Sequence, residues 1–136
     1  MNEEKTSHNL FVLVVIGFIF TLHSTLTVYI TSSFLSQFID ESRVGIVYTL
    51  GSLLTIAFFT AIVGILRRFG NYKTILSLLF LTLLSLIGMA YSEYALLAFA
   101  FFMLNFVVIA LTGFSFDIFL ESFSSNAKTG KIRGTF

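Results

Sequence analysis

The sequence predicts an all-α integral membrane protein with four antiparallel transmembrane helices. Its 136 residues are 57% hydrophobic and 11% charged, and the mean hydropathy is +0.96. A soluble domain of this length cannot hide so much apolar surface, because small domains keep a large share of their residues at the boundary. The apolar residues also form four runs close to the roughly 20 residues that a helix needs to cross a bilayer. Backbone groups in lipid must find partners within the segment, so the runs are predicted as helices.

The predicted helices cover about residues 10–38, 44–66, 72–91 and 94–119, and residues 120–136 are predicted as a cytoplasmic tail. The connections between them are short, which makes neighbouring helices antiparallel. Lys and Arg then set the direction of insertion. Arg43 stands on one side of the membrane, and the other seven stand on the opposite side: Lys5, Arg67, Arg68, Lys73, Lys128, Lys131 and Arg133. The bias predicts a multi-pass protein of the cell membrane with both termini cytoplasmic.

The first predicted helix is divided into an apolar half and a polar half. Residues 10–20 carry nothing more polar than Gly, whereas the following "TLHSTLTVYITSS" is crowded with hydroxyls. At 100° per residue, four polar side chains fall within about a quarter-turn of one another: His23, Ser24, Thr27 and Thr31. Such a stripe should face a bundle interior or a water-filled cavity. It either lines a substrate path or bonds to carbonyls of its own helix and bridges to neighbours.

The second and third predicted helices offer fewer chemical groups. The second has a face of small residues, and small residues let helix backbones approach closely. We therefore expect this face to be a seam that packs against another helix. Its residues are Gly45, Thr49, Ser52, Ala57, Thr60, Ala61 and Gly64. The third, "TILSLLFLTLLSLIGMAY", has no charged or amide group, and we expect it to be the most lipid-exposed of the four.

The fourth predicted helix places an amide deep in its span and two acids near its cytoplasmic end. Asn105 is either a hydrogen bond between helices or a group in a cavity. Asp117 and Glu121 are one turn apart and therefore share a face. They stand at the same membrane level as Arg67 and Arg68, which predicts an ion-pair cluster.

"VGILRRFGNYK", residues 63–73, resembles the loop between the second and third helices of major facilitator superfamily (MFS) transporters. The family pattern there reads roughly G-x-L-a-D-R-x-G-R-R-K. Arg68 takes the Arg position, Gly70 the second Gly and Lys73 a basic position. Arg67 replaces the acid of the pattern, and three further positions depart from it: Val63, Asn71 and Tyr72. The passage from the first to the second helix and the tail "AKTGKIRGTF" are also similar to the corresponding family segments.

The resemblance implies the first part of the N-terminal six-helix bundle of such a transporter. Members of the family have about twelve helices in two bundles, each made of inverted three-helix repeats, so this chain corresponds to one repeat and the helix after it. In the family the first and fourth helices line the cavity, which places the polar stripe and Asn105 near the substrate path. The loop and Asp117 would brace the cytoplasmic side. We therefore expect a fragment of a transporter that moves a small solute by alternating access and that is inactive alone.

Two alternatives remain open, a stand-alone four-helix membrane interaction or assembly protein and a small homodimeric exporter. An enzyme is not predicted, because the sequence has no paired intramembrane carboxylates, no HExxH and no GxSxG. No cofactor, metal site or nucleic-acid partner is expected either, since the chain has no Cys and a net charge of +1. The predicted partners are the lipid bilayer, an unidentified small-molecule solute, and the remaining transporter helices or another membrane subunit.

Overall fold

The structure is a computed structural model that describes the backbone of residues 3–123 and the side chains of residues 11–121 apart from Leu13. Every regular element in this range is a helix: α1 (Glu3–Leu35), α2 (Glu41–Phe69), α3 (Asn71–Ala90) and α4 (Ala95–Phe123). Each of these helices contains a stretch long and apolar enough to cross a membrane. The described part of the chain is therefore that of a multi-pass membrane protein.

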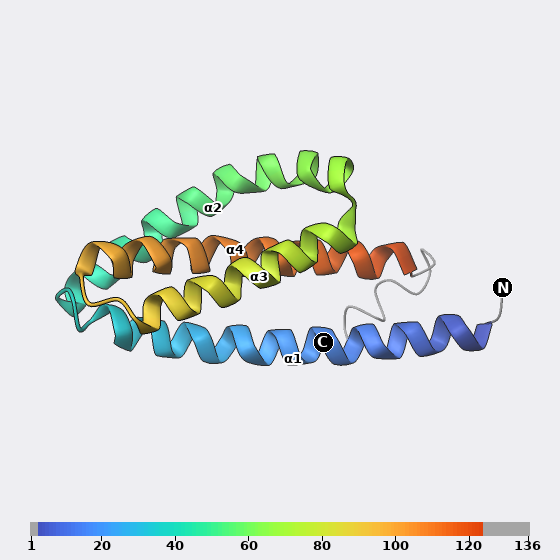
Figure 1. Cartoon of the computed structure of the whole chain (residues 1–136), viewed down its shortest axis with the longest axis horizontal. Coiled ribbons are helices and arrows are strands. Elements are labelled where there is room, and N and C mark those ends of the chain that lie inside the picture. The colour runs from blue at the N-terminus through green and yellow to red at the C-terminus, as the bar shows by residue number, and fades with distance from the viewer. Residues whose placement is uncertain (1–2, 124–136) are drawn as a thin grey trace.

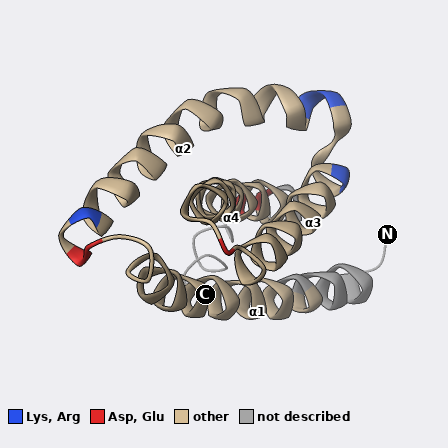
Figure 2. Cartoon of the chain, turned by 60° about the vertical axis from the view of Figure 1, so that its left-hand side comes forward, with Lys and Arg blue, Asp and Glu red and all other residues tan. Residues whose placement is uncertain are grey.

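The four helices lie side by side with α4 between the other three. The α1–α2 and α3–α4 connections lie at one end of the structure, whereas the α2–α3 connection lies at the opposite end, with the start of α1 and the end of α4 (Figure 1). Contacts join α4 to each of the other helices, and the closest packing is between α3 and α4. Figure 2 shows α4 enclosed between the arch of α2 and the pair α1 and α3.

Three of the four helices extend further into polar sequence than predicted. The first begins at Glu3 and ends at Leu35, the second continues to Phe69, and the fourth ends at Phe123. The predicted tail is thus helical over residues 120–123, and residues 124–136 lie outside the described range. Hydropathy locates the part of a helix that sits in lipid. Glu and Arg are good helix formers and carry the helix beyond that part.

Two clusters of buried side chains hold the helices together. One joins α2, α3 and α4 through Ile62, Leu78, Val107, Val108 and Leu111. The other lies near the opposite end, where Phe102 of α4 is 1% exposed and Tyr48 of α2 meets its ring edge-on at 5.3 Å. Nearby, the backbone of Gly51 lies close to α4, because a Cβ there would stand 2.9 Å from the ring of Phe106.

The predicted exposure of the third helix is wrong, and the predicted seam of the second is not used by the helices that the structure describes. In α3, 33% of the apolar stretch is buried, against 11% in α1 and 17% in α2. The seven seam residues of α2 are all exposed, and a Cβ at Gly45 or Gly64 would meet nothing within 4 Å. The face of α2 that packs on α4 contains Gly51, Thr55 and Ile62 instead. The sequence shows which face of a helix carries small residues, but it does not show which other helix packs against that face.

Candidate functional site

The predicted polar stripe of α1 is largely satisfied by its own helix. Thr27 and Thr31 are 7% and 5% exposed, and their hydroxyls donate to the carbonyls of His23 and Thr27, each at 2.8 Å. Ser24 donates to the carbonyl of Thr21 at 2.9 Å. The Oγ1 of Thr31 also lies 3.4 Å from the hydroxyl of Tyr48 on α2. Bonding within the helix and bridging between helices therefore account for these hydroxyls.

His23 belongs to the predicted stripe but, unlike Thr27 and Thr31, it is exposed. Its backbone carbonyl accepts the bond from Thr27, while no side chain in the described part of the chain bonds to its ring. The structure does not bring His23 together with Asn105.

Asn105 forms a hydrogen bond between helices. It is 3% exposed, and its Nδ2 donates to the Oγ of Ser85 on α3 at 2.8 Å. Ser85 is fully buried, and its hydroxyl donates in turn to the carbonyl of Thr82 at 2.7 Å. This chain of bonds gives both side chains a partner inside the α3–α4 contact, so the structural interpretation of Asn105 fits the geometry.

Sequence reasoning missed a second polar face on α1. Thr21, Thr25 and Ser32 follow one another at spacings of four and seven, so they lie within about 40° of one another. All three are exposed, and the hydroxyls of Thr21 and Thr25 donate to the carbonyls of Gly17 and Thr21 in their own helix, each at 2.9 Å. Each of these hydroxyl oxygens can still accept a bond from water or a solute. The spacing is visible in "TLHSTLTVYITS", and it could have been found by testing every hydroxyl for helical register. We call these three residues the outer polar face of α1.

Two hollows open beside the outer polar face. One, of about 390 Å³, lies between α1 and α4 and is lined by Gly17, Phe20, Thr21, Gly113, Phe116, Asp117 and Leu120. The other, of about 380 Å³, contains Ser32 and Ser33 of α1 with Tyr48 of α2. A different exposed face of α1 is apolar and carries Leu22, Leu26 and Ile30. The two exposed faces differ in chemistry at the same depth along one helix.

The segment that carries Arg67, Arg68 and Lys73, here called the basic segment, consists of the end of α2 and the start of α3 joined by Gly70 alone. The sequence had suggested a longer turn. Arg67 and Arg68 lie in the last turn of α2, and Lys73 lies in the first turn of α3. Gly70 between them has φ 81° and ψ 157°. This backbone conformation is essentially restricted to glycine. Gly70 thus allows α2 to continue almost directly into α3.

Of the two acids near the end of α4, Asp117 lines a hollow. Asp117 is exposed in the hollow between α1 and α4, among residues of α1. Within residues 11–121, neither Arg67 nor Arg68 forms an ion pair with Asp117, and the guanidinium of Arg68 lies 5.5 Å from the ring centroid of Phe69. Glu121 has a partner of its own. The predicted ion-pair cluster between the acids and the arginines stays a prediction.

Asn71 provides a different link between the basic segment and α4. With its amide oxygen and nitrogen assigned from the surrounding hydrogen bonds, it donates to the carbonyl of Ser115 at 3.3 Å and accepts from the N–H of Phe119 at 3.1 Å. Both backbone groups flank Asp117 in the sequence. The start of α3 is therefore fastened to the end of α4 by an amide at a position where the MFS pattern has a basic residue.

Comparison with known proteins finds no family model, curated protein or solved structure that matches the chain. Within the residues that the structure describes, no group of three His, Cys, Asp or Glu side chains could hold a metal ion.

Proposed function

We propose that the chain is the N-terminal four-helix portion of an MFS-like secondary transporter that moves a small solute by alternating access. The observation that carries the proposal is the outer polar face of α1. Polar groups on membrane helices face a bundle interior or a water-filled cavity, yet α2, α3 and α4 leave Thr21, Thr25 and Ser32 uncovered. Further transporter helices or another membrane subunit would complete a water-filled path over this face. The four helices alone leave it open and would not transport.

The charges support an orientation in the cell membrane. Arg67, Arg68 and Lys73 lie at the α2–α3 junction, at the end of the structure where α1 begins. Asp40, Glu41 and Arg43 lie at the α1–α2 connection and Glu93 lies in the α3–α4 connection, both at the opposite end (Figure 1). By the positive-inside rule, the end with the basic segment is cytoplasmic, and so are both termini. In this orientation Gly70 and Asn71 brace the cytoplasmic ends of α2, α3 and α4, a structural part of the alternating mechanism.

Paired cysteine substitutions test the proposal, because the chain has no native Cys. Thr25→Cys lies on the outer polar face, and Leu26→Cys lies one residue away at nearly the same depth on the exposed apolar face. Each variant, in its native membrane assembly, is treated with a charged maleimide in right-side-out and in inverted vesicles. Only a thiol that contacts water ionises and reacts. Alternating access predicts that Thr25→Cys is labelled from both sides and that Leu26→Cys is labelled from neither.

The same experiment separates transport from its main alternative, a membrane assembly protein. The exposed small-residue face of α2 favours contact with another helix, which either function would use. In an assembly protein, protein would cover the outer polar face permanently, and Thr25→Cys would remain unlabelled from both sides. Equal labelling of Thr25→Cys and Leu26→Cys would also contradict the proposed path.

A further inference from the structure

An apolar groove of about 710 Å³ lies between α2 and α3 on the surface of α4. It exists because α2 arches away from α3 beyond their junction (Figure 1). Its walls include Leu54 and Phe58 of α2, Leu78 and Leu81 of α3, and Met103 of α4. In a bilayer, such a groove opens onto hydrocarbon. An apolar cavity does not retain water, so its occupant is apolar too.

The groove extends along α2 from Leu54 to Phe69, a length of about 22 Å at the helical rise of about 1.5 Å per residue. One leaflet of a bilayer is about 20–22 Å thick with its headgroup region, and about 15 Å of this is hydrocarbon. The groove therefore extends from one membrane surface to about the midplane, which is the depth that a phospholipid acyl chain occupies. This match in length favours a lipid that enters from the end with the basic segment.

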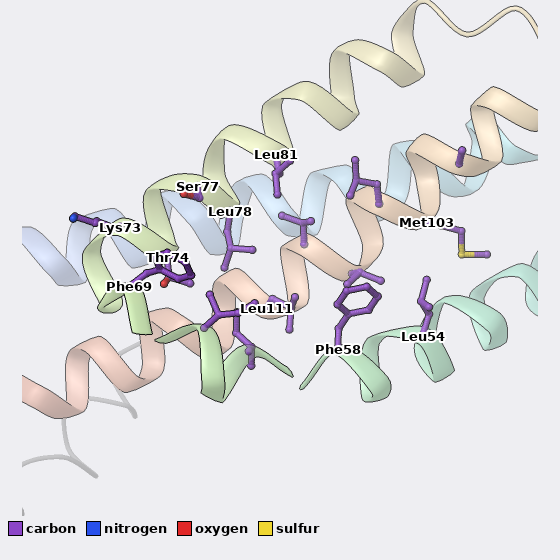
Figure 3. A pocket seen from close by; sticks show the side chains of 16 residues that line it. Leu54, Phe58, Phe69, Lys73, Thr74, Ser77, Leu78, Leu81, Met103 and Leu111 are labelled. Atoms are coloured by element: carbon purple, nitrogen blue, oxygen red, sulfur yellow. The ribbon is translucent and has the colours of Figure 1, made fainter. Parts of the chain in front are cut away.

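That end of the groove is cationic. Lys73 is the single charged residue among those that line it. In Figure 3 its ammonium nitrogen points away from the apolar side chains, while Thr74 and Ser77 follow on the same helix. Arg67 and Arg68 stand in the last turn of α2 at the same end. In the described part of the chain, neither these arginines nor Lys73 forms an ion pair.

We propose that this groove binds an anionic phospholipid, with an acyl chain between α2 and α3 and the phosphate at Lys73. The apolar walls accept the chain, and the unpaired cations supply the complementary charge. Basic pockets between membrane helices on the cytoplasmic side bind anionic head groups in this way. The inference does not depend on transport, since it concerns a different face of the molecule from the outer polar face of α1.

Native mass spectrometry of the full chain in detergent tests the proposal. The protein is titrated with phosphatidylglycerol and with phosphatidylcholine of identical acyl chains. Phosphatidylglycerol should bind more tightly, and Lys73→Gln should weaken its binding about fivefold while leaving phosphatidylcholine unchanged. Arg43→Gln is the matched control, because it removes one exposed positive charge at the opposite end of the structure. It should keep the preference for phosphatidylglycerol.

A second variant tests the location of the acyl chain. Ser77→Trp places a bulky ring on an exposed position in the wall of the groove and should weaken the binding of both lipids, with the helix content unchanged by circular dichroism. Equal binding of the two lipids, or equal effects of Lys73→Gln and Arg43→Gln, would overturn the proposal. A photoreactive group at Ser77 in membranes should crosslink to lipid. A crosslink to another polypeptide would show that a partner helix fills the groove, and the proposal would then be wrong.

Discussion

The hydrogen bond between Asn105 and Ser85 should contribute measurably to the α3–α4 contact. Nδ2 of Asn105 lies 2.8 Å from Oγ of Ser85, and the two residues are 3% and 0% exposed. Ser85→Ala removes the acceptor and leaves a buried amide donor without a partner, which should lower the free energy of unfolding by about 1–2 kcal/mol. Asn105→Leu removes the amide and keeps a similar bulk. Its cost should be smaller, about 1 kcal/mol or less, because Ser85 retains its bond to Thr82.

A double-mutant cycle isolates this bond. Hydrogen bonds between membrane helices contribute about 0.6 kcal/mol on average and up to about 1.7 kcal/mol. The double variant should therefore cost less than the sum of the two single variants by an amount in this range. Unfolding of the full chain is followed by circular dichroism in mixed micelles at increasing denaturant. Thr60→Ala is the control, because that exposed hydroxyl bonds only to its own helix. It should be additive with Asn105→Leu. Additivity within about 0.3 kcal/mol for Ser85→Ala and Asn105→Leu would show that the two side chains are not coupled.

Two glycine substitutions probe the other close contacts. A Cβ at Gly88 would overlap the ring of Phe101 on α4, so Gly88→Ala should destabilise the chain by about 1–3 kcal/mol. Gly64→Ala, where a Cβ meets nothing within 4 Å, should not. Phe101→Leu should partly rescue Gly88→Ala, and equal stability of the two Ala variants would contradict this packing. Gly70→Ala places a side chain at φ 81° and should cost about 1–3 kcal/mol in the same unfolding assay. An unchanged midpoint would show that the α2–α3 junction relaxes.

The sequence predicted the four helices because hydropathy over about 20 residues is a strong signal in lipid. It did not predict the helix ends, since charged residues such as Glu41 and Arg68 continue a helix outside the hydrocarbon region. The sequence also did not predict which helices pack against one another. Leu-rich α3 resembles a lipid-facing helix, yet it packs closely on α4 through Ser85, Gly88 and Met89.

The candidate site was predicted only in part, for a related physical reason. Helical register correctly placed Thr27 and Thr31 on one face, and both are buried. Register alone cannot tell which polar face a neighbouring helix covers. It therefore identified the stripe in which Thr27 and Thr31 are already buried, and it missed the exposed Thr25 and Ser32. The basic segment was identified from its residue types, whereas the backbone conformation of Gly70 is seen only in the structure.

Uptake of a solute is the direct test of transport along the outer polar face of α1. Membrane vesicles that contain the chain in its native assembly are supplied with labelled sugars, amino acids, nucleosides and organic cations, and uptake is measured. If the assembly is a transporter, at least one solute accumulates. Ser32→Ala or Thr25→Val should reduce its uptake about tenfold, the effect of losing about 1.4 kcal/mol of hydrogen bonding along the path. Leu26→Val on the apolar face should leave uptake unchanged. Uptake of no solute, or equal uptake by all three variants, would contradict transport along the outer polar face of α1.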